Sequence, residues 1–503
     1  MTEHTAIRPA GFATRQVHAG RAPGAGAGTV NPRATPIYLT AGFEFDDFAQ
    51  ARDRFGGAED GFTYTRIGNP TTSSAERRIA ALEGGIDAIL VGSGQAAVAS
   101  AVLGLLQAGD HLVSASSIYE GSRGLFLDNF GRLGIDTSFV VDANDAAEWE
   151  RAIRPTTRAL FVESIPNPKN DLVDIALVAE VAHRHGIPLI VDNTFATPYL
   201  QRPLEHGADV VVHSASKFLA GHGSVLGGVI VSGSAFDWAV TDARGPLFPH
   251  LAEPAHALGG RSYVERFGAS AFITYVRDVV VSRFGPTPSP LNAFLIEQGI
   301  ETLSLRVDRQ SRSALAIARW LEHQPGVESV DYSGLESSPF HALAERYLPD
   351  GQGSVFAFTL AGGAAAAEVF FDSVELFTRM THLGDVRSLI IHPASTTHAH
   401  RTAEQLAEAG IAPGLVRLSI GVEDVDDLVD DLARGLAAVR GAGLVPDARG
   451  VAAGPDARGA DVASVDLTAE NRGAGENDDA RAAHDGGGAD EARDGSALVH
   501  EAA

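Results

Sequence analysis

The fold is decided by the stretch Val210-Val211-Val212-His213-Ser214-Ala215-Ser216-Lys217-Phe218, read together with Leu189-Ile190-Val191-Asp192-Asn193-Thr194 shortly before it. Each stretch opens with a short apolar run rich in β-branched residues and then turns abruptly polar, as strands buried in a parallel sheet do. Ligands of open α/β sheets bind at the carboxyl ends of such strands. We therefore expect Asp192 and Lys217 to lie close together at that end of a sheet.

Amine, acid and hydroxyl groups in this arrangement suit an aldehyde cofactor with a phosphate tail. The amine of Lys217 can form a Schiff base with the aldehyde, and the carboxylate of Asp192 can keep a pyridine nitrogen protonated so that the ring accepts electrons. Ser214 and Ser216 offer hydroxyl groups to the phosphate. A lone lysine after a strand is usually an ordinary solvated side chain, but this combination predicts a site for pyridoxal 5′-phosphate (PLP).

A second stretch favours an anion site. Ser93-Gly94-Gln95 lies between an apolar run and the start of an expected helix. The first N–H groups of that helix, at Gly94 and Gln95, would point outward with the positive end of the helix dipole behind them. One glycine-rich turn is a weak signal. Together with Ser214 and Ser216, however, it predicts a phosphate cradle.

Composition restricts the class of protein. The chain has 503 residues, of which 45% are hydrophobic and 20% charged, as in soluble globular proteins, and this length predicts at least two domains. A formal net charge of −25 argues against nucleic acids and anionic membranes as partners. The absence of cysteine excludes disulfides, thiolate metal sites and cysteine nucleophiles. Without an apolar signal segment or a membrane-length apolar stretch, the chain is expected in the cytoplasm.

Hydrophobic periodicity divides the chain into four parts. Residues 1–70 are rich in Gly, Pro and Thr and are expected to form an arm that packs on something else. Strands and helices alternate over 71–285, which predicts a mostly parallel sheet, and residues 286–444 are expected to form a smaller α+β domain. The expected strands are 88–91, 111–114, 159–163, 189–192, 209–213, 228–231, 354–360 and 416–420, and the expected helices include 75–82, 95–106, 175–185, 291–323 and 425–439.

The fourth part, 445–503, differs in character from the rest. Residues 447–503 hold thirteen Asp or Glu against five Arg and no aromatic residue, and Pro-Asp-Ala-Arg-Gly occurs twice, at 446–450 and 455–459. Such a segment cannot bury enough apolar surface to offset the entropy lost on ordering. We expect a disordered acidic tail that is dispensable for catalysis, and a regulatory or partner-binding tail is the alternative.

Five motifs together resemble the Cys/Met-metabolism PLP enzymes, over about residues 12 to 440. They are the two stretches quoted at the outset, Tyr64-Thr65-Arg66-Ile67-Gly68-Asn69-Pro70, Glu163-Ser164-Ile165-Pro166-Asn167-Pro168 and His392-Pro393-Ala394-Ser395-Thr396-Thr397-His398. The resemblance implies fold-type I, the aspartate aminotransferase-like α/β fold: a PLP-binding domain with a mostly parallel sheet and a smaller C-terminal α+β domain. It also accounts for His392, His398 and His400, whose spacing alone would suggest a metal, so no metal site is expected.

The resemblance also implies roles. Lys217 would carry the cofactor and move protons between substrate carbons, and Asp192 would pair with the pyridine nitrogen. Tyr119 would stack on the cofactor ring; otherwise it is an ordinary aromatic residue at a strand end. The phosphate would be bound by Gly94, Gln95, Ser214 and Ser216 of one chain and by Tyr64 and Arg66 of the neighbouring subunit. A complete site would then need a homodimer at least, and a homotetramer is expected.

Three further residues are implied to bind the substrate. Arg417, in Val416-Arg417-Leu418-Ser419-Ile420-Gly421, matches the arginine that grips the α-carboxylate. A guanidinium fork suits that anion, and an arginine inside an apolar strand otherwise needs an explanation. Asn167 would lie near the phenolic oxygen of the cofactor and the substrate carboxylate, and Ser388 would line the same pocket.

Within the family, the chain is similar to the sulfhydrylases that act on O-acetyl-L-homoserine. Segments 259–273, 289–295 and 298–306 carry that similarity, whereas Pro166 and Glu120-Gly121-Ser122-Arg123 depart from it. The implied reaction is a γ-replacement that converts O-acetyl-L-homoserine and sulfide, or methanethiol, to L-homocysteine, or L-methionine, and acetate. The alternatives are an O-succinylhomoserine sulfhydrylase, a cystathionine γ-synthase or a γ-lyase and, outside enzymes, a PLP-binding regulator without turnover.

Overall fold

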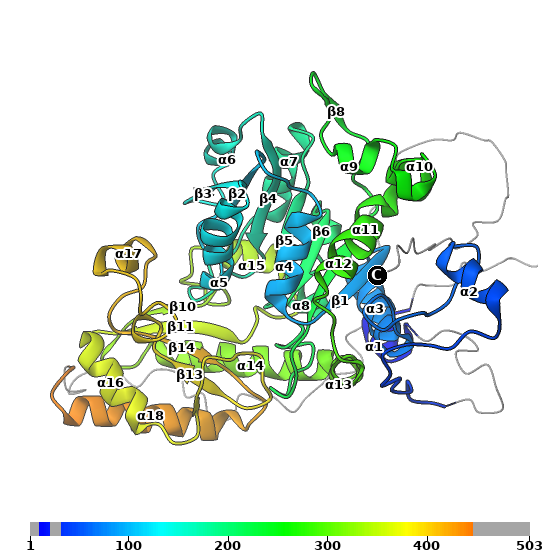
Figure 1. Ribbon diagram of the computed structural model, residues 1–503. Helices are drawn as coiled ribbons and strands as arrows, with labels where there is room; N and C mark the ends of the chain where they lie inside the picture. The colour runs from blue at the N-terminus through cyan, green and yellow to red at the C-terminus, as the bar shows by residue number, and fades with distance from the viewer. Residues whose placement is uncertain (1–9, 21–31, 446–503) are drawn as a thin grey trace, which may run out of the picture.

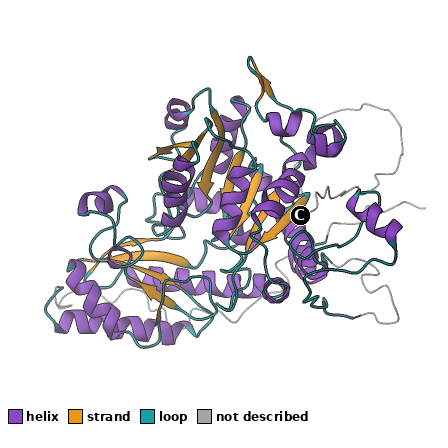
Figure 2. Ribbon diagram, viewed as in Figure 1, coloured by secondary structure: helices purple, strands orange, loops and turns teal. Residues whose placement is uncertain are grey.

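The computed structural model describes residues 10–20 and 32–445, so the acidic tail expected from the sequence lies outside the described residues from 446 onward. An N-terminal arm precedes two layered units (Figure 1). The first unit contains a 7-stranded sheet and the second a 5-stranded sheet, each flanked by helices (Figure 2). No helix in these two described ranges is long and apolar enough to cross a membrane.

The large sheet has the strand order β1-β7-β6-β5-β4-β2-β3. All neighbours from β6 to β3 are parallel, and only β7 runs antiparallel, to both β6 and β1. The mostly parallel sheet predicted from the sequence is therefore confirmed. Its strands are β1 (Asp87–Val91), β2 (His111–Ala115), β3 (Asp136–Val140), β4 (Thr157–Glu163), β5 (Leu189–Asp192), β6 (Val210–His213) and β7 (Gly228–Ser232).

Both faces of this sheet are buried, which explains why its strands are continuous apolar runs. Successive residues of β1 alternate between two core clusters: Ile89 and Val91 belong to one, and Ala88 and Leu90 to the other. The flanking helices begin at residues whose side chains accept a hydrogen bond from the first turn. They include α3 (Pro70–Glu83), capped by Asn69, α4 (Gly94–Leu103), capped by Ser93, and α7 (Ile175–Arg184), capped by Asp174.

The small sheet has the order β10-β11-β14-β13-β12, and α16 (Gly363–Ser373) and α18 (Val425–Gly441) pack together on one of its faces (Figure 1). Its central strand is β14 (Leu415–Ser419), between β11 (Val355–Leu360) and β13 (Leu389–Ile391). The sequence did not predict the short outer strands β10 (Val327–Asp331) and β12 (Thr378–Arg379). The folded unit reaches Val445, which is 8% exposed, one residue past the predicted boundary.

The prediction of one helical stretch over residues 291–323 is wrong. The structure has α13 (Pro290–Ile300) and α14 (Leu303–Leu321), with a break at Glu301 and Thr302. Close to this break α13 packs tightly on the turn after β6, because a Cβ on Gly299 would lie 2.4 Å from the carbonyl oxygens of Leu219 and Ala220. The break therefore brings both helices against the turn that follows β6.

The arm contains α1 (Phe12–His18) and α2 (Phe48–Phe55). None of the three core clusters has a buried member between residues 32 and 69, and Leu39 and Phe48 are 73% and 83% exposed. In Figure 1 the α2 region lies on the opposite side of the molecule from the small domain. The described part of the arm thus has no core of its own.

Candidate active site

Lys217 lies in the turn after β6, at the carboxyl end of the large sheet. The backbone closes this turn with a hydrogen bond from Lys217 N to the carbonyl of Ser214 at 3.1 Å. Arg306 of α14 holds the turn from behind, donating to the carbonyl of Phe218 at 2.9 Å. Burial and, to a smaller extent, the positive charge of Arg417 together lower the pKa of Lys217 to about 8. The amine can thus become a free base near neutral pH.

Asp192 ends the neighbouring strand β5, and a chain of hydrogen bonds joins it to the Lys217 turn. Thr194 donates from N and Oγ1 to Oδ1 of Asp192, at 3.0 and 2.5 Å. The same Oγ1 accepts a hydrogen bond of 2.8 Å from the N–H of Ser214, three residues before Lys217. The two strand ends quoted at the start of the sequence therefore do meet at one edge of the sheet.

The carboxyl group of Asp192 lacks a cation. Burial raises its pKa, and burial together with the charge of Asp192 raises the pKa of Glu163, its register partner on β4, well above the usual range. Among the described residues, no Lys, Arg or His lies within ion-pair distance of Asp192. A protonated pyridine nitrogen would supply the missing positive charge.

The amino end of α4 lies against Ser214 in the Lys217 turn. A Cβ on Gly94 would be 2.7 Å from the Cβ of Ser214, so only glycine allows this approach. The N–H groups at Gly94 and Gln95 are free of intrahelical partners by geometry, and with Ser214 they form an anion cradle. Ser216 is differently placed: its hydroxyl donates to the carbonyl of Gly227 and accepts from its N–H, at 3.2 and 3.0 Å.

Tyr119 precedes α5 (Glu120–Gly124), and its side chain is not packed in the core. The residue is 48% exposed, so one ring face is available to a ligand. Its N–H donates to Oε1 of Glu163 at 2.6 Å, which ties Tyr119 to the carboxyl pair of β4 and β5. A Cβ on Gly121 would lie 2.4 Å from the Tyr119 ring, so the ring can occupy this position only because residue 121 is a glycine.

Arg417 reaches the site from β14 of the small domain. The residue is 3% exposed, and no described Asp or Glu pairs with it. Nη1 donates to Oδ1 of Asn167 at 3.2 Å, and Nη2 donates to the carbonyls of Thr381 and His382 at 3.2 and 3.1 Å. Nε has no partner among the described residues. A buried guanidinium without a counter-charge is a strong site for a carboxylate.

The sequence analysis missed His382. Its Nδ1 lies 3.0 Å from Nζ of Lys217, within hydrogen-bond distance. Burial lowers the pKa of His382 to about 4, and Lys217 contributes in the same direction. The sequence around His382 has no periodicity or spacing that relates this histidine to Lys217, so sequence reasoning had no signal with which to find it.

Ser388, by contrast, is not brought to the Lys217 and Arg417 cluster by any hydrogen bond. Its hydroxyl donates to Glu423 at 2.9 Å and accepts from the N–H of Gly421 at 2.9 Å. Tyr64 and Arg66 also stay apart from the cluster within one chain. Arg66 donates to the carbonyl of Ser282, and its guanidinium lies 5.5 Å from the centre of the Tyr64 ring.

The histidines considered as metal ligands have other partners. His392 is within hydrogen-bond distance of Ser395 Oγ and the carbonyl of Pro413, at 2.8 and 2.9 Å. Within the described ranges, no three His, Asp or Glu side chains gather where they could hold a metal ion.

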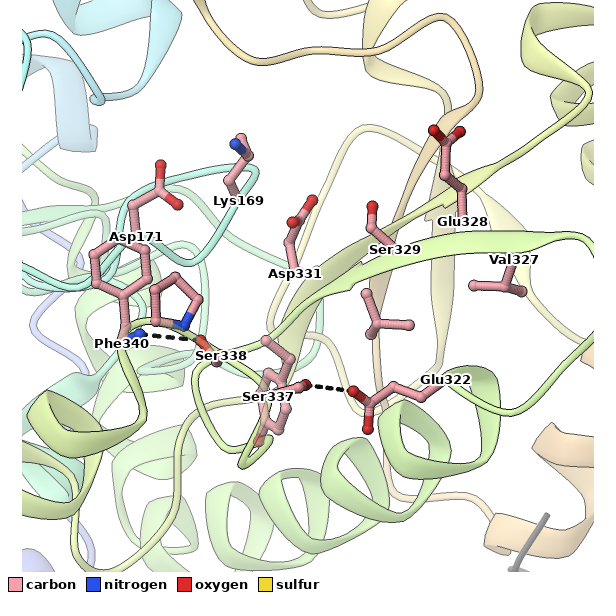
Figure 3. Close-up of a pocket in the computed structure, with 13 residues that line it drawn as sticks. Lys169, Asp171, Glu322, Val327, Glu328, Ser329, Asp331, Ser337, Ser338 and Phe340 are labelled. Atoms are coloured by element: carbon pink, nitrogen blue, oxygen red, sulfur yellow. Dashed lines mark hydrogen bonds between the residues drawn. The ribbon is translucent and has the colours of Figure 1, made fainter.

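A separate cavity of about 430 Å³ lies beside β10, and Figure 3 shows its lining. Carboxylates such as Asp171 and Asp331 face it together with Lys169. None of the predicted site residues lines it, so it is distinct from the Lys217 site.

The groups around Lys217 fit PLP. The aldehyde of PLP suits the half-buried amine of Lys217 with its lowered pKa, and the pyridine nitrogen suits the half-buried carboxyl group of Asp192, which has no cation at ion-pair distance. The exposed ring of Tyr119 and the amino end of α4 suit the cofactor ring and the phosphate. Arg417 adds a place for a carboxylate. The chain contains only two lysines, Lys169 and Lys217: Lys217 belongs to this cluster, whereas Lys169 lines the separate cavity beside β10.

Comparisons with known proteins agree with this geometry. The model of the family described as Cys/Met metabolism PLP-dependent enzyme matches residues 13–437. The O-acetyl-L-homoserine sulfhydrylase of Corynebacterium glutamicum is 44% identical over 429 residues, covering 85% of this chain and 97% of that protein. The O-succinylhomoserine sulfhydrylase of Pseudomonas aeruginosa is 41% identical, covering 80% of this chain and 90% of that protein.

A solved structure is also similar. The crystal structure described as an O-acetylhomoserine (thiol)-lyase of Campylobacter jejuni superposes with a TM-score of 0.80 at 32% identity, covering 85% of this chain and 100% of that one. That structure carries a pyridoxyl-lysine phosphate, in which the cofactor is attached to a lysine.

Proposed function

Because the chain belongs to the family of Cys/Met metabolism PLP-dependent enzymes, we propose that it is an O-acetyl-L-homoserine sulfhydrylase. It converts O-acetyl-L-homoserine and sulfide, or methanethiol, to L-homocysteine, or L-methionine, and acetate. The observation that carries this proposal is that the half-buried amine of Lys217 lies in one site with the buried Arg417, which lacks a counter-charge. These two groups suit a substrate that reacts at its amino-acid carbons and carries an α-carboxylate.

The residues divide the work of a γ-replacement between them. When bound, PLP supplies an electron sink that stabilises negative charge on the substrate carbons. Lys217 holds the cofactor and, once released as a free base, takes protons from the α- and β-carbons. Arg417 and Asn167 hold the α-carboxylate. Asp192 pairs with the ring nitrogen, and Tyr119 covers the ring. Gly94, Gln95 and Ser214 hold the phosphate, and Ser216 joins them when its hydroxyl turns away from the carbonyl of Gly227. Ser388, whose hydroxyl also bonds Glu423 and Gly421, lines the same pocket in our proposal.

Acetyl rather than succinyl is the proposed acyl group. A succinyl ester carries a second carboxylate, which would need another cation beside Arg417. The candidate is Arg387, but it is already paired with Asp385, donating from Nε and Nη2 at 2.8 and 2.9 Å. Its side chain is 63% exposed. The O-succinyl ester is the second candidate substrate, because a relative at 41% identity is named for it.

The proposed active unit is a homo-oligomer, at least a dimer and in our proposal a tetramer, in the cytoplasm. The arm supports this because it exposes apolar side chains such as Leu39 and Phe48, and Arg66 contacts Ser282 and Tyr64 instead of the Lys217 cluster of its own chain. A neighbouring subunit would receive both residues at its phosphate cradle. Residues 446–503 are proposed to take no part in the reaction, since the family match ends at 437.

Initial rates with O-acetyl- and O-succinyl-L-homoserine, each with sulfide and with cysteine as acceptor, test the proposed function. We expect homocysteine from the acetyl ester and sulfide, with kcat/KM at least about tenfold above the succinyl ester. Cystathionine formation from cysteine at a comparable rate, or ketoacid release without an acceptor, would assign the chain to another activity of the family.

A further inference from the structure

His382 contacts both functional cations of the site. Its Nδ1 lies 3.0 Å from Nζ of Lys217, while its carbonyl accepts a hydrogen bond of 3.1 Å from Nη2 of Arg417. The histidine therefore sits between the amine that would move protons and the guanidinium that would hold the substrate.

The imidazole is neutral at physiological pH. Burial, the charge of Lys217 and more weakly those of Arg417 and Arg387 lower the pKa of His382 to about 4, against the opposing effect of Asp385. An ammonium group has donors only, so Nδ1 must accept from a protonated Lys217 and the imidazole proton lies on Nε2. His382 thus offers Lys217 an uncharged hydrogen-bond acceptor, whereas the guanidinium of Arg417 in the same site can only donate.

Structural duties do not explain this side chain. Nε2 is buried and has no partner among the described residues, so Lys217 is the one described residue that hydrogen-bonds the imidazole. A buried polar atom without a hydrogen-bond partner lowers stability, so its presence in a native structure indicates a role other than stability. By comparison, buried His111 at the start of β2 has both ring nitrogens engaged, with Thr157 and Ser138.

We propose that His382 is a further residue of the reaction site, which orients the Lys217 amine by hydrogen bonding and keeps it directed between cofactor and substrate. This inference rests on the proposed function, because it assigns a partner to the proton-moving lysine. The hydrogen bond favours the ammonium form over the free amine, since charged donors bond more strongly. Removing it would lower the pKa of Lys217 and leave the amine unrestrained.

Three variants of the full-length chain test the proposal. His382→Leu removes the acceptor, His382→Asn keeps one near the position of Nδ1, and His111→Asn is a matched control at another buried histidine whose pKa is lowered to about 4. His382→Ala replaces His382→Leu if the leucine variant does not fold. Two experiments are made on each variant. The first measures steady-state kcat and KM. The second removes the cofactor and measures how the rate of PLP attachment to the chain depends on pH.

In His382→Leu we expect kcat to fall by about 10 to 100-fold with KM little changed. The midpoint of the PLP attachment profile should fall by about half to one pH unit. His382→Asn should recover most of both, and His111→Asn should change neither. An unmoved midpoint in His382→Leu, with or without loss of turnover, would overturn the proposal, as would an asparagine variant as impaired as the leucine variant. If the wild type attaches PLP but makes no homocysteine, the proposed function fails, while the midpoint still decides the role of His382.

Discussion

Arg417 and Asn167 meet across the two domains, with Nη1 of Arg417 3.2 Å from Oδ1 of Asn167. The first lies on the central strand of the small sheet, and the second follows β4 of the large sheet. This contact places a buried guanidinium at the carboxyl end of the large sheet, beside Lys217, and each domain alone would have only half of the site.

Replacing Arg417 should separate activity from stability. In Arg417→Met we expect kcat/KM for the acetyl ester to fall by about 10² to 10³-fold, or roughly 3 to 4 kcal/mol, mainly through KM. The thermal midpoint should stay the same or rise, because a buried charge without a counter-charge is replaced by an apolar side chain of similar size. A large drop in the thermal midpoint together with an unchanged KM would show that Arg417 is structural.

Arg387→Ala should leave both acyl esters with nearly unchanged kcat/KM. The guanidinium is exposed and engaged by Asp385, so it is not available to a second carboxylate. Parallel assays of the two esters check this expectation, with Arg379→Ala as a control that removes another exposed arginine. Selective loss of the succinyl activity in Arg387→Ala would identify Arg387 as the succinyl-binding cation.

Mixing two inactive variants should restore activity if Arg66 acts across subunits. Arg66→Ala and Lys217→Ala chains, refolded together, form mixed pairs in which one site has both residues intact. Up to about a quarter of the wild-type rate is expected from random pairing in dimers. Mass spectrometry of the mixture establishes that subunits have exchanged. Demonstrated exchange without any recovered turnover would contradict sharing of Arg66.

Asp278 should make the fold less stable as the pH rises. Burial raises its pKa from 3.8 to about 7 in the folded chain. A carboxyl whose folded pKa is raised is favourable below its unfolded pKa, and that contribution is lost as the pH rises through the folded pKa. Asp278→Asn cannot ionise, so its gain in unfolding free energy over the wild type should grow by about 2 to 3 kcal/mol between pH 5 and pH 8. Urea unfolding at both pH values measures it. Exposed Asp128→Asn is the control, and an equal gain at both pH values would refute the prediction.

The sequence predicted those parts of the site that depend on local patterns. Apolar, β-branched runs precede Asp192 and Lys217, and a glycine turn precedes α4. Such local patterns are typical of a buried parallel sheet and can be recognised in the sequence. Arg417 was implied by the family resemblance, and its place inside an apolar strand supported that role. His382 was missed because its relation to Lys217 depends on how the small domain packs on the large one, and no local pattern reports a contact between residues 165 positions apart.

The predicted long helix over 291–323 failed for a related reason. The helix breaks just after Gly299, which packs closely on the backbone of Leu219 and Ala220, and helix propensity does not reveal such a tertiary contact. The family resemblance implied that Ser388 lines the substrate pocket, and this stays a prediction. In the structure Glu423 and Gly421 take up its hydroxyl.

The central claim is that Lys217 carries the cofactor of this enzyme, and a chain with only two lysines allows a direct measurement. Borohydride reduction of the purified enzyme, followed by digestion and mass spectrometry, will fix the cofactor on the lysine that holds it. We expect the phosphopyridoxyl mass on the peptide that contains Lys217, none on the peptide with Lys169, and loss of both label and turnover in Lys217→Ala but not in Lys169→Ala. Label on Lys169, or label retained in Lys217→Ala, would contradict the account.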